Sequence, residues 1–271
     1  MTPTVRVLTF NVLHPVHGQN YDELPMRSEH YDEPTRVAAL ITFLGHIIDA
    51  HRDEELLLIA LQEVSERARA ALLALALARG VHATSCKVAR QAKLKPGKCR
   101  AGYTDAVGAA GADEYEMLLA FSPETLGATH CAVFENDAGK GFCALEAPES
   151  GVLFVSTHVS YGEKRHAQFA ALGAYAQAYV DTHDDSICVV AGDFNCAHGA
   201  LRAGMPGAMV LTPQCASRIG VIGTGLLVSA DTPSHVVVVS RMAIECPVVR
   251  VYETDTAMLS DHRPVEAILE F

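Results

Sequence analysis

The sequence predicts an α/β fold in which stacked β-sheets carry helices on their outer faces. A succession of strand, helix, strand and helix opens the chain and returns in its second half, after a strand-rich middle. Strands such as residues 187–191 and 236–240 are apolar on both faces, so each needs cover on both sides. No Pro-, Gly- or Ser-rich linker separates the halves, and we therefore expect residues 1–271 to form a single domain.

The first half begins with a predicted strand at residues 5–12. A helix is expected to begin near Thr35, because apolar residues then recur at three-and-four spacing and form one stripe. A buried strand follows at residues 56–61. Residues 65–79 form the next predicted helix, which Ser65 can cap at its start and Gly80 can end in a left-handed conformation.

The rest of the chain is predicted to consist of strands around one long amphipathic helix at residues 163–183. Turn residues separate the strands of the middle region. The predicted strands are residues 117–122, 131–134, 141–146, 152–157, 187–191, 221–228, 236–240, 248–252 and 265–271.

Composition limits the function classes. The hydrophobic share of 49% permits a large core, and no segment resembles a secretory signal or a membrane helix. The eight cysteines are scattered without a CxxC pair, which favours reduced thiols and a cytoplasmic or nuclear location. A net charge of −11 argues against binding a polyanion over a broad basic face. Carboxylates gathered around a divalent cation could still accept a phosphate.

Polar groups stand at the tips of several apolar strands. Ligand sites of α/β sheets collect at strand tips, so these groups are expected to form one cluster. They are Asn11, Glu63, His158, Asp193 with Asn195, and Asp261 with His262.

The cluster has the residue types that metal-assisted attack on phosphate requires. Glu63 and Asp261 offer the hard oxygen ligands that Mg²⁺ or Mn²⁺ prefers, with Asn11 as a neutral neighbour. Asp193 could deprotonate a water, Asn195 could hold that water or a phosphoryl oxygen, and the two histidines could donate hydrogen bonds to developing charge. Each residue alone also has a structural explanation, such as a turn or a helix start. Their joint occurrence favours a catalytic site over these separate structural roles.

Residues 86–100 are strongly basic, with six Lys or Arg side chains and no acid. This segment is either a solvated loop or an electropositive lip that receives phosphates. Under the second interpretation its Lys93, Lys95 and Lys98 bind substrate, together with Arg165, which follows His158.

Five motifs occur in a fixed order: FNVL, LQEV, STH followed by R..Q, AGDFN and SDHRPV. This order resembles the endonuclease/exonuclease/phosphatase superfamily. The resemblance implies a four-layer sandwich, with two mixed β-sheets packed face to face and helices on both outer faces. It also implies Glu63 as the chief Mg²⁺ ligand near Asn11 and Asp261. Asp193 would activate the attacking water, Asn195 would orient it, and His158 and His262 would stabilise the phosphoryl group.

Two positions depart from the superfamily pattern. An Asp that orients the catalytic histidine is usual in the penultimate core strand, but the sequence here is PSHVVVVS, with His235 at that position when Ser240 is kept in register. Either Asp231 substitutes for this Asp, or His235 is a structural core residue. Leu13 stands where apurinic endonucleases carry an acid, which disfavours a role in base excision.

FNVL followed by a long polar insert and a helix that opens with Arg36 is closest to the deadenylase and nocturnin branch. The resulting prediction is a Mg²⁺-dependent phosphodiesterase of nucleic acid or nucleotides, similar to a 3′–5′ exoribonuclease. A phosphatase of small substrates such as inositol phosphates is the alternative, and an inactive binding scaffold is another. The choice among RNA, DNA and nucleotides stays open, as does the oligomeric state.

Overall fold

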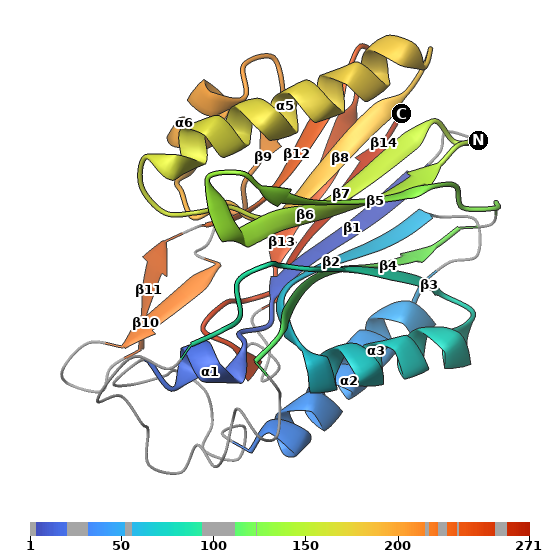
Figure 1. Cartoon of the computed structure of the whole chain (residues 1–271). Helices are drawn as coiled ribbons and strands as arrows, with labels where there is room; N and C mark the ends of the chain where they lie inside the picture. The colour runs from blue at the N-terminus through green and yellow to red at the C-terminus, as the bar shows by residue number, and fades with distance from the viewer. Residues whose placement is uncertain are drawn as a thin grey trace.

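The computed structural model describes residues 4–20, 32–51, 56–93, 112–122, 124–214, 217–221, 227–231, 233–252 and 259–271. Two six-stranded sheets lie face to face between two layers of helices (Figure 1). This arrangement confirms the predicted four-layer α/β sandwich.

The first sheet has the strand order β13-β14-β1-β2-β4-β3. Its β1 and β2 are parallel, and its other neighbouring pairs are antiparallel, so the sheet is mixed. The strands are β1 (Thr4–Asn11), β2 (Leu56–Ser65), β3 (His82–Lys87), β4 (Glu114–Phe121), β13 (Glu245–Val251) and β14 (Val265–Glu270).

The second sheet has the order β5-β6-β7-β8-β12-β9. Here β7 and β8 are parallel, whereas the other pairs are antiparallel. The strands are β5 (Thr129–Phe134), β6 (Asp137–Ala147), β7 (Val152–His158), β8 (Ile187–Asp193), β9 (Met209–Leu211) and β12 (Ser234–Ser240). Each sheet thus holds one parallel pair at its centre.

Helices cover the outer face of each sheet (Figure 1). α2 (Glu33–Asp49) and α3 (Glu66–Arg79) pack on the first sheet, while α5 (Lys164–Thr182) and α6 (His198–Gly204) pack on the second. The short α1 (Pro15–Gly18) follows β1. Alternation along β2 builds both layers of the core, because Leu57, Ile59 and Leu61 face the helices and Leu56, Leu58 and Ala60 face the other sheet.

The structure confirms the predicted capping residues of α3. The Ser65 side chain accepts a hydrogen bond from the Ala68 amide at 3.2 Å, and Gly80 has a φ of 65° at the C-cap. α2 begins at Glu33, two residues before Thr35, because Asp32 supplies the N-cap and accepts from the Thr35 amide.

The predicted strand at residues 221–228 is wrong. The structure has two short strands there, β10 (Arg218–Val221) and β11 (Leu227–Asp231), which pair with each other in a separate two-stranded sheet. Among the described residues, no helix combines the length and apolar character needed to span a membrane. The described cysteines are free thiols, as predicted: Cys86, Cys131, Cys143, Cys188, Cys196 and Cys246.

Candidate active site

The predicted strand tips of both sheets meet at one place. Asn11, the last residue of β1, lies at the centre: its Nδ2 donates to Glu63 Oε1 at 3.2 Å and to Asp193 Oδ2 at 3.0 Å. Glu63 belongs to the first sheet and Asp193 to the second, so one amide group joins the two sheets. The side chains of Asn11 and Asp193 are buried.

Glu63 lies in a β-bulge of β2. The pairing of β2 with β4 shifts between Leu61 and Val64, and Glu63 has a φ of 57°, which is strained for a residue with a Cβ. Gln62 beside it points between the sheets and donates to Ser156 Oγ at 3.2 Å. Burial opposes ionisation of Glu63, but the nearby His17 imidazole and Lys140 ammonium hold its pKa well below the usual range. The bulge thus presents an ionised carboxylate.

Asp193 and Asn195 form a fixed turn at the end of β8. The Asn195 amide donates to Asp193 Oδ1 at 3.0 Å, and Asn195 adopts a φ of 49°, which asparagine tolerates better than most residues. Its Nδ2 donates to the Val159 carbonyl at 2.7 Å, and its buried Oδ1 has no hydrogen-bond partner among the described residues. Burial would raise the pKa of Asp193, but His262, His158 and the hydrogen bond from Asn11 lower it overall.

His262 contacts Asp193 from the loop before β14. Its Nε2 lies 3.5 Å from Asp193 Oδ2, and its backbone amide donates to Ser260 Oγ at 3.1 Å. Ser260 also donates to the Asn11 carbonyl at 2.8 Å, which ties this loop to β1. The carboxylate of Asp261 lies 3.6 Å from the Arg218 guanidinium.

His158, at the end of β7, faces the same carboxylates from the other side. Its Nε2 is 3.6 Å from Asp193 Oδ2 and 3.9 Å from Glu63 Oε1. Lys140 of β6 places its ammonium 2.9 Å from Nδ1 and 2.5 Å from Nε2 of this ring. Burial and then the Lys140 charge lower the pKa of His158 to about 4, so the ring is neutral at pH 7. Lys140 thus brings an ammonium group into the site, and the sequence analysis missed it.

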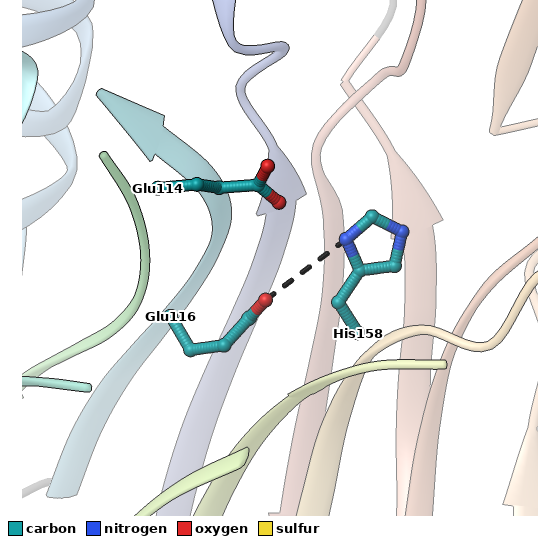
Figure 2. A group of neighbouring side chains, drawn as sticks. All are labelled: Glu114, Glu116 and His158. Carbon is teal, nitrogen blue, oxygen red and sulfur yellow. Dashed lines mark ion pairs between the residues drawn. The ribbon is translucent and has the colours of Figure 1, made fainter. Parts of the chain in front are cut away.

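Two further acids missing from the prediction lie next to His158. Glu114 and Glu116 are two residues apart on β4 and therefore share a face of the first sheet. Figure 2 shows both carboxylates directed toward the imidazole, with Glu116 Oε1 3.9 Å from His158 Nδ1. Glu114 Oε2 is also 2.8 Å from His17 Nε2 of α1.

Arg165 and Lys93 were predicted to bind phosphate, and both lie among the described residues. Arg165 donates from Nη1 to the Asn195 carbonyl at 3.3 Å, so its guanidinium contacts the turn that holds Asp193 and Asn195. Lys93 accepts a hydrogen bond from Asn20 at its backbone carbonyl. Lys95 and Lys98 lie outside the described residues. A substrate-binding role of the basic segment stays a prediction.

The two residues at the start of β12 point in opposite directions. His235 is buried on the face that packs under α5, with Nδ1 2.9 Å from Thr212 Oγ1 and Nε2 2.9 Å from the Cys196 carbonyl. Ser234 instead faces His262, with its Oγ 3.5 Å from Nδ1. This geometry favours the structural interpretation of His235. The side chain of Asp231 is outside the described residues.

The carboxylates of this site fit a divalent cation. Glu63 and Asp261 are hard oxygen donors, whereas the Asn11 amide oxygen accepts a hydrogen bond from the Leu13 backbone amide at 3.0 Å. Burial raises the pKa of Asp261, and the negative charges of Glu63 and Asp193 add to this shift. A cation held by Glu63, Asp261 and Asn11 would relieve that repulsion.

Comparisons with known proteins agree with this fold. The structure of ANGEL2, a 2′,3′-cyclic phosphatase, in complex with adenosine-2′,3′-vanadate aligns with a TM-score of 0.69 and 15% identity, covering 100% of this chain and 96% of that chain. Danio rerio (D. rerio) TDP2 complexed with a single-strand DNA product aligns at 0.62 and 12% identity, covering 99% of both chains. A Bacteroides vulgatus endonuclease/exonuclease/phosphatase aligns at 0.62 and 16% identity, also covering 99% of both.

Identities this low show the shared fold alone. No curated protein sequence matches this chain. The family itself is shown by a model of the endonuclease/exonuclease/phosphatase family, which matches residues 8–208. The strand tips that join Asn11, Glu63 and Asp193 fall within that match. This chain therefore belongs to the endonuclease/exonuclease/phosphatase family.

Proposed function

We propose that this chain is a divalent-cation-dependent phosphodiesterase that acts on nucleic acid or nucleotides. One observation carries the proposal: Asn11 Nδ2 bridges Glu63 and Asp193, while ring nitrogens of His158 and His262 lie within 3.6 Å of the same Asp193 oxygen. Carboxylates and hydrogen-bond donors thus surround one point, as hydrolysis of a phosphate ester requires.

Asp193 is proposed to accept a proton from the attacking water. Its lowered pKa keeps it ionised at neutral pH, and its hydrogen bonds to Asn11 and Asn195 fix its orientation. Asn195 would orient that water or a phosphoryl oxygen through its buried, unpartnered Oδ1.

Positive and neutral donors would stabilise the charge that develops on the phosphoryl group. Lys140 contributes a full charge beside His158, and His262 contributes an imidazole on the other side of Asp193. Mg²⁺ or Mn²⁺ held by Glu63, Asp261 and Asn11 would act as a Lewis acid on a phosphate oxygen.

Nucleic acid or nucleotides are the proposed substrates because two structural neighbours carry such ligands. ANGEL2 holds adenosine-2′,3′-vanadate, and D. rerio TDP2 holds a single-strand DNA product. ANGEL2 is named a 2′,3′-cyclic phosphatase, which keeps a phosphatase as the second candidate. The 3′–5′ exoribonuclease activity and the deadenylase branch stay predictions.

Product analysis on a substrate panel tests the proposal. The panel comprises single-stranded RNA, single-stranded DNA, RNA with a 2′,3′-cyclic phosphate end, nucleotides and inositol phosphates. Each is incubated with Mg²⁺, with Mn²⁺ or with EDTA. We expect metal-dependent cleavage of nucleic acid or nucleotides, and a higher Mg²⁺ requirement for Glu63→Ala.

The other outcomes decide between the alternatives. Phosphate release from inositol phosphates alone would replace the proposal with the phosphatase. Tight ligand binding without turnover on any substrate would identify a binding scaffold. Turnover that persists in EDTA would contradict the metal dependence.

A further inference from the structure

A second group of metal-binding side chains lies beside the candidate active site, and we propose that Glu114, Glu116 and His158 bind a divalent cation of their own. Two of these residues come from β4 of the first sheet and the third from β7 of the second. Each offers one donor atom, and these atoms all lie within 4.8 Å of one another. Figure 2 shows the two carboxylates and the imidazole directed into the same space.

The carboxylate of Glu116 supplies an independent reason to expect a ligand. Glu116 is fully buried, and neither of its oxygens has a hydrogen-bond partner among the described residues. Oε1 of Glu114 is buried and unpartnered in the same way. A buried carboxylate without a partner is unfavourable, and a cation between these groups would satisfy it.

The spacing is close to that of a bound ion. Zinc bonds to carboxylate oxygen or imidazole nitrogen measure about 2.0–2.2 Å, so two donors of one ion lie at most about 4.4 Å apart. The three donor atoms here all lie within 4.8 Å of one another, which is close to that span. Two carboxylates and one imidazole suit Mn²⁺ or Zn²⁺ better than Mg²⁺, which prefers oxygen ligands and bound waters.

His158 separates this site from the one around Glu63. Its Nδ1 lies 3.9 Å from Glu116 Oε1, whereas its Nε2 lies 3.9 Å from Glu63 Oε1. A cation on the Glu116 side would thus share the imidazole with the candidate active site without using Glu63, Asn11 or Asp261. The second site goes beyond the proposed function and does not depend on it.

Lys140 would compete with this cation for His158 Nδ1. Its ammonium lies 2.9 Å from His158 Nδ1, the nitrogen that faces Glu116. A divalent ion at the same nitrogen must displace it, because two positive charges at this distance repel strongly. The site therefore binds either the ammonium or the divalent cation, and removal of the lysine charge should tighten cation binding.

Counting bound Mn²⁺ tests the proposal without an activity assay. The full chain is freed of metal with EDTA, dialysed and titrated with Mn²⁺, and free Mn²⁺ is followed by electron paramagnetic resonance. We expect about two Mn²⁺ per wild-type chain and about one in Glu116→Gln, since a neutral amide is a weaker ligand than a carboxylate. Glu149→Gln makes the same charge change at an exposed position and should leave two.

Further variants separate this proposal from the proposed function. Glu63→Gln should also bind one Mn²⁺, and the double variant Glu63→Gln/Glu116→Gln should bind none. A wild-type count of one that Glu116→Gln leaves unchanged would overturn the second site, whereas the Glu63 site would stand. A count unaffected by Glu63→Gln but lowered by Glu116→Gln would overturn the metal role of Glu63 and support the second site.

Thermal unfolding shows whether a lower Mn²⁺ count comes from a misfolded variant. In EDTA, Glu116→Gln should melt no lower than the wild type, since it replaces a buried carboxyl group whose oxygens have no hydrogen-bond partner among the described residues, and it should gain less than the wild type when Mn²⁺ is added. If Glu116→Gln fails to fold, Glu114→Gln tests the same loss of one ion. The competition by Lys140 is tested with Lys140→Met, which should bind the second Mn²⁺ more tightly, by about tenfold or more. An unchanged affinity in Lys140→Met would contradict the competition.

Discussion

Ser234 Oγ lies 3.5 Å from His262 Nδ1, whereas the adjacent His235 lies on the opposite face of β12. On this strand, the side chain that contacts the His262 ring is therefore the hydroxyl of Ser234. His235 belongs to a separate, partly buried chain of hydrogen bonds through Thr212 to His198.

Replacement of His235 by aspartate should destabilise the protein. The change would bury a carboxylate beside the Cys196 carbonyl, and we expect a loss of about 3 kcal/mol or more in the free energy of unfolding. Urea denaturation measures the loss, and His235→Gln, which keeps a donor and an acceptor, should cost less. Preserved stability with increased activity would mean that His235 faces His262 after all.

Asp193→Asn should lower turnover by about 10² to 10⁴, the range for a positioned acid or base. The amide keeps the shape of the side chain but cannot accept the water proton. Steady-state kinetics on the substrate found by the panel measure the effect, and circular dichroism checks the fold. Wild-type turnover in a folded Asp193→Asn protein would remove Asp193 from the mechanism.

Glu33→Gln should cost about 3–5 kcal/mol of stability, because it leaves a buried guanidinium without its carboxylate. Arg36 is 1% exposed and pairs with Glu33 at 2.8 Å, and it also donates to the carbonyls of Val12 and Leu259. Asp49→Asn breaks the exposed pair with Arg79 and provides the matched control, with a much smaller expected cost because solvent screens an exposed pair. If urea denaturation shows that the two variants lose the same free energy of unfolding, the buried pair is no more stabilising than the exposed one.

His158 should make the metal-free protein less stable in mild acid. Its pKa is about 4 in the folded chain against 6.5 for an ordinary histidine, so below about pH 6.5 the unfolded chain binds a proton that the folded chain refuses. Stability is lost as the pH falls from about 6.5 to 4, by up to about 3 kcal/mol from this group.

His158→Asn isolates this effect from the other groups that titrate in the site. Urea unfolding in EDTA at pH 7 and pH 5 should show a smaller acid loss in the variant than in the wild type. The same loss in both proteins would mean that His158 is not held neutral. The titratable groups that face the ring are Glu63, Glu114, Glu116, Asp193 and Lys140.

Local sequence signals were enough to predict most elements and the meeting of the strand tips. Ser65 and Gly80 mark the ends of α3 through their own backbone chemistry, which does not depend on distant residues. The strand at 221–228 was wrong because β10 and β11, which pair with each other in antiparallel fashion, both contain apolar residues. Hydrophobicity alone cannot show such a reversal.

Lys140, Glu114 and Glu116 were missed because each lies just outside a predicted strand. Their importance arises from packing between the sheets, which periodicity does not report. One signal was available: a hairpin that pairs Ala147 with Val152 must also pair Gly141 with His158, and this places Lys140 next to the histidine. The register of Ser234 against Asp193 is likewise a property of the folded sheet.

The place of β14 has a consequence for how the protein is made. This strand lies between β13 and β1, so the first described strand pairs with the last. While residues 265–270 are still inside the ribosome, one edge of β1 has no partner, and such open edges invite association with other chains. Asp261 and His262 emerge just before the same strand. Residues 261–270 must therefore leave the ribosome before β1 has partners on both edges and before Asp261 and His262 can reach the candidate site.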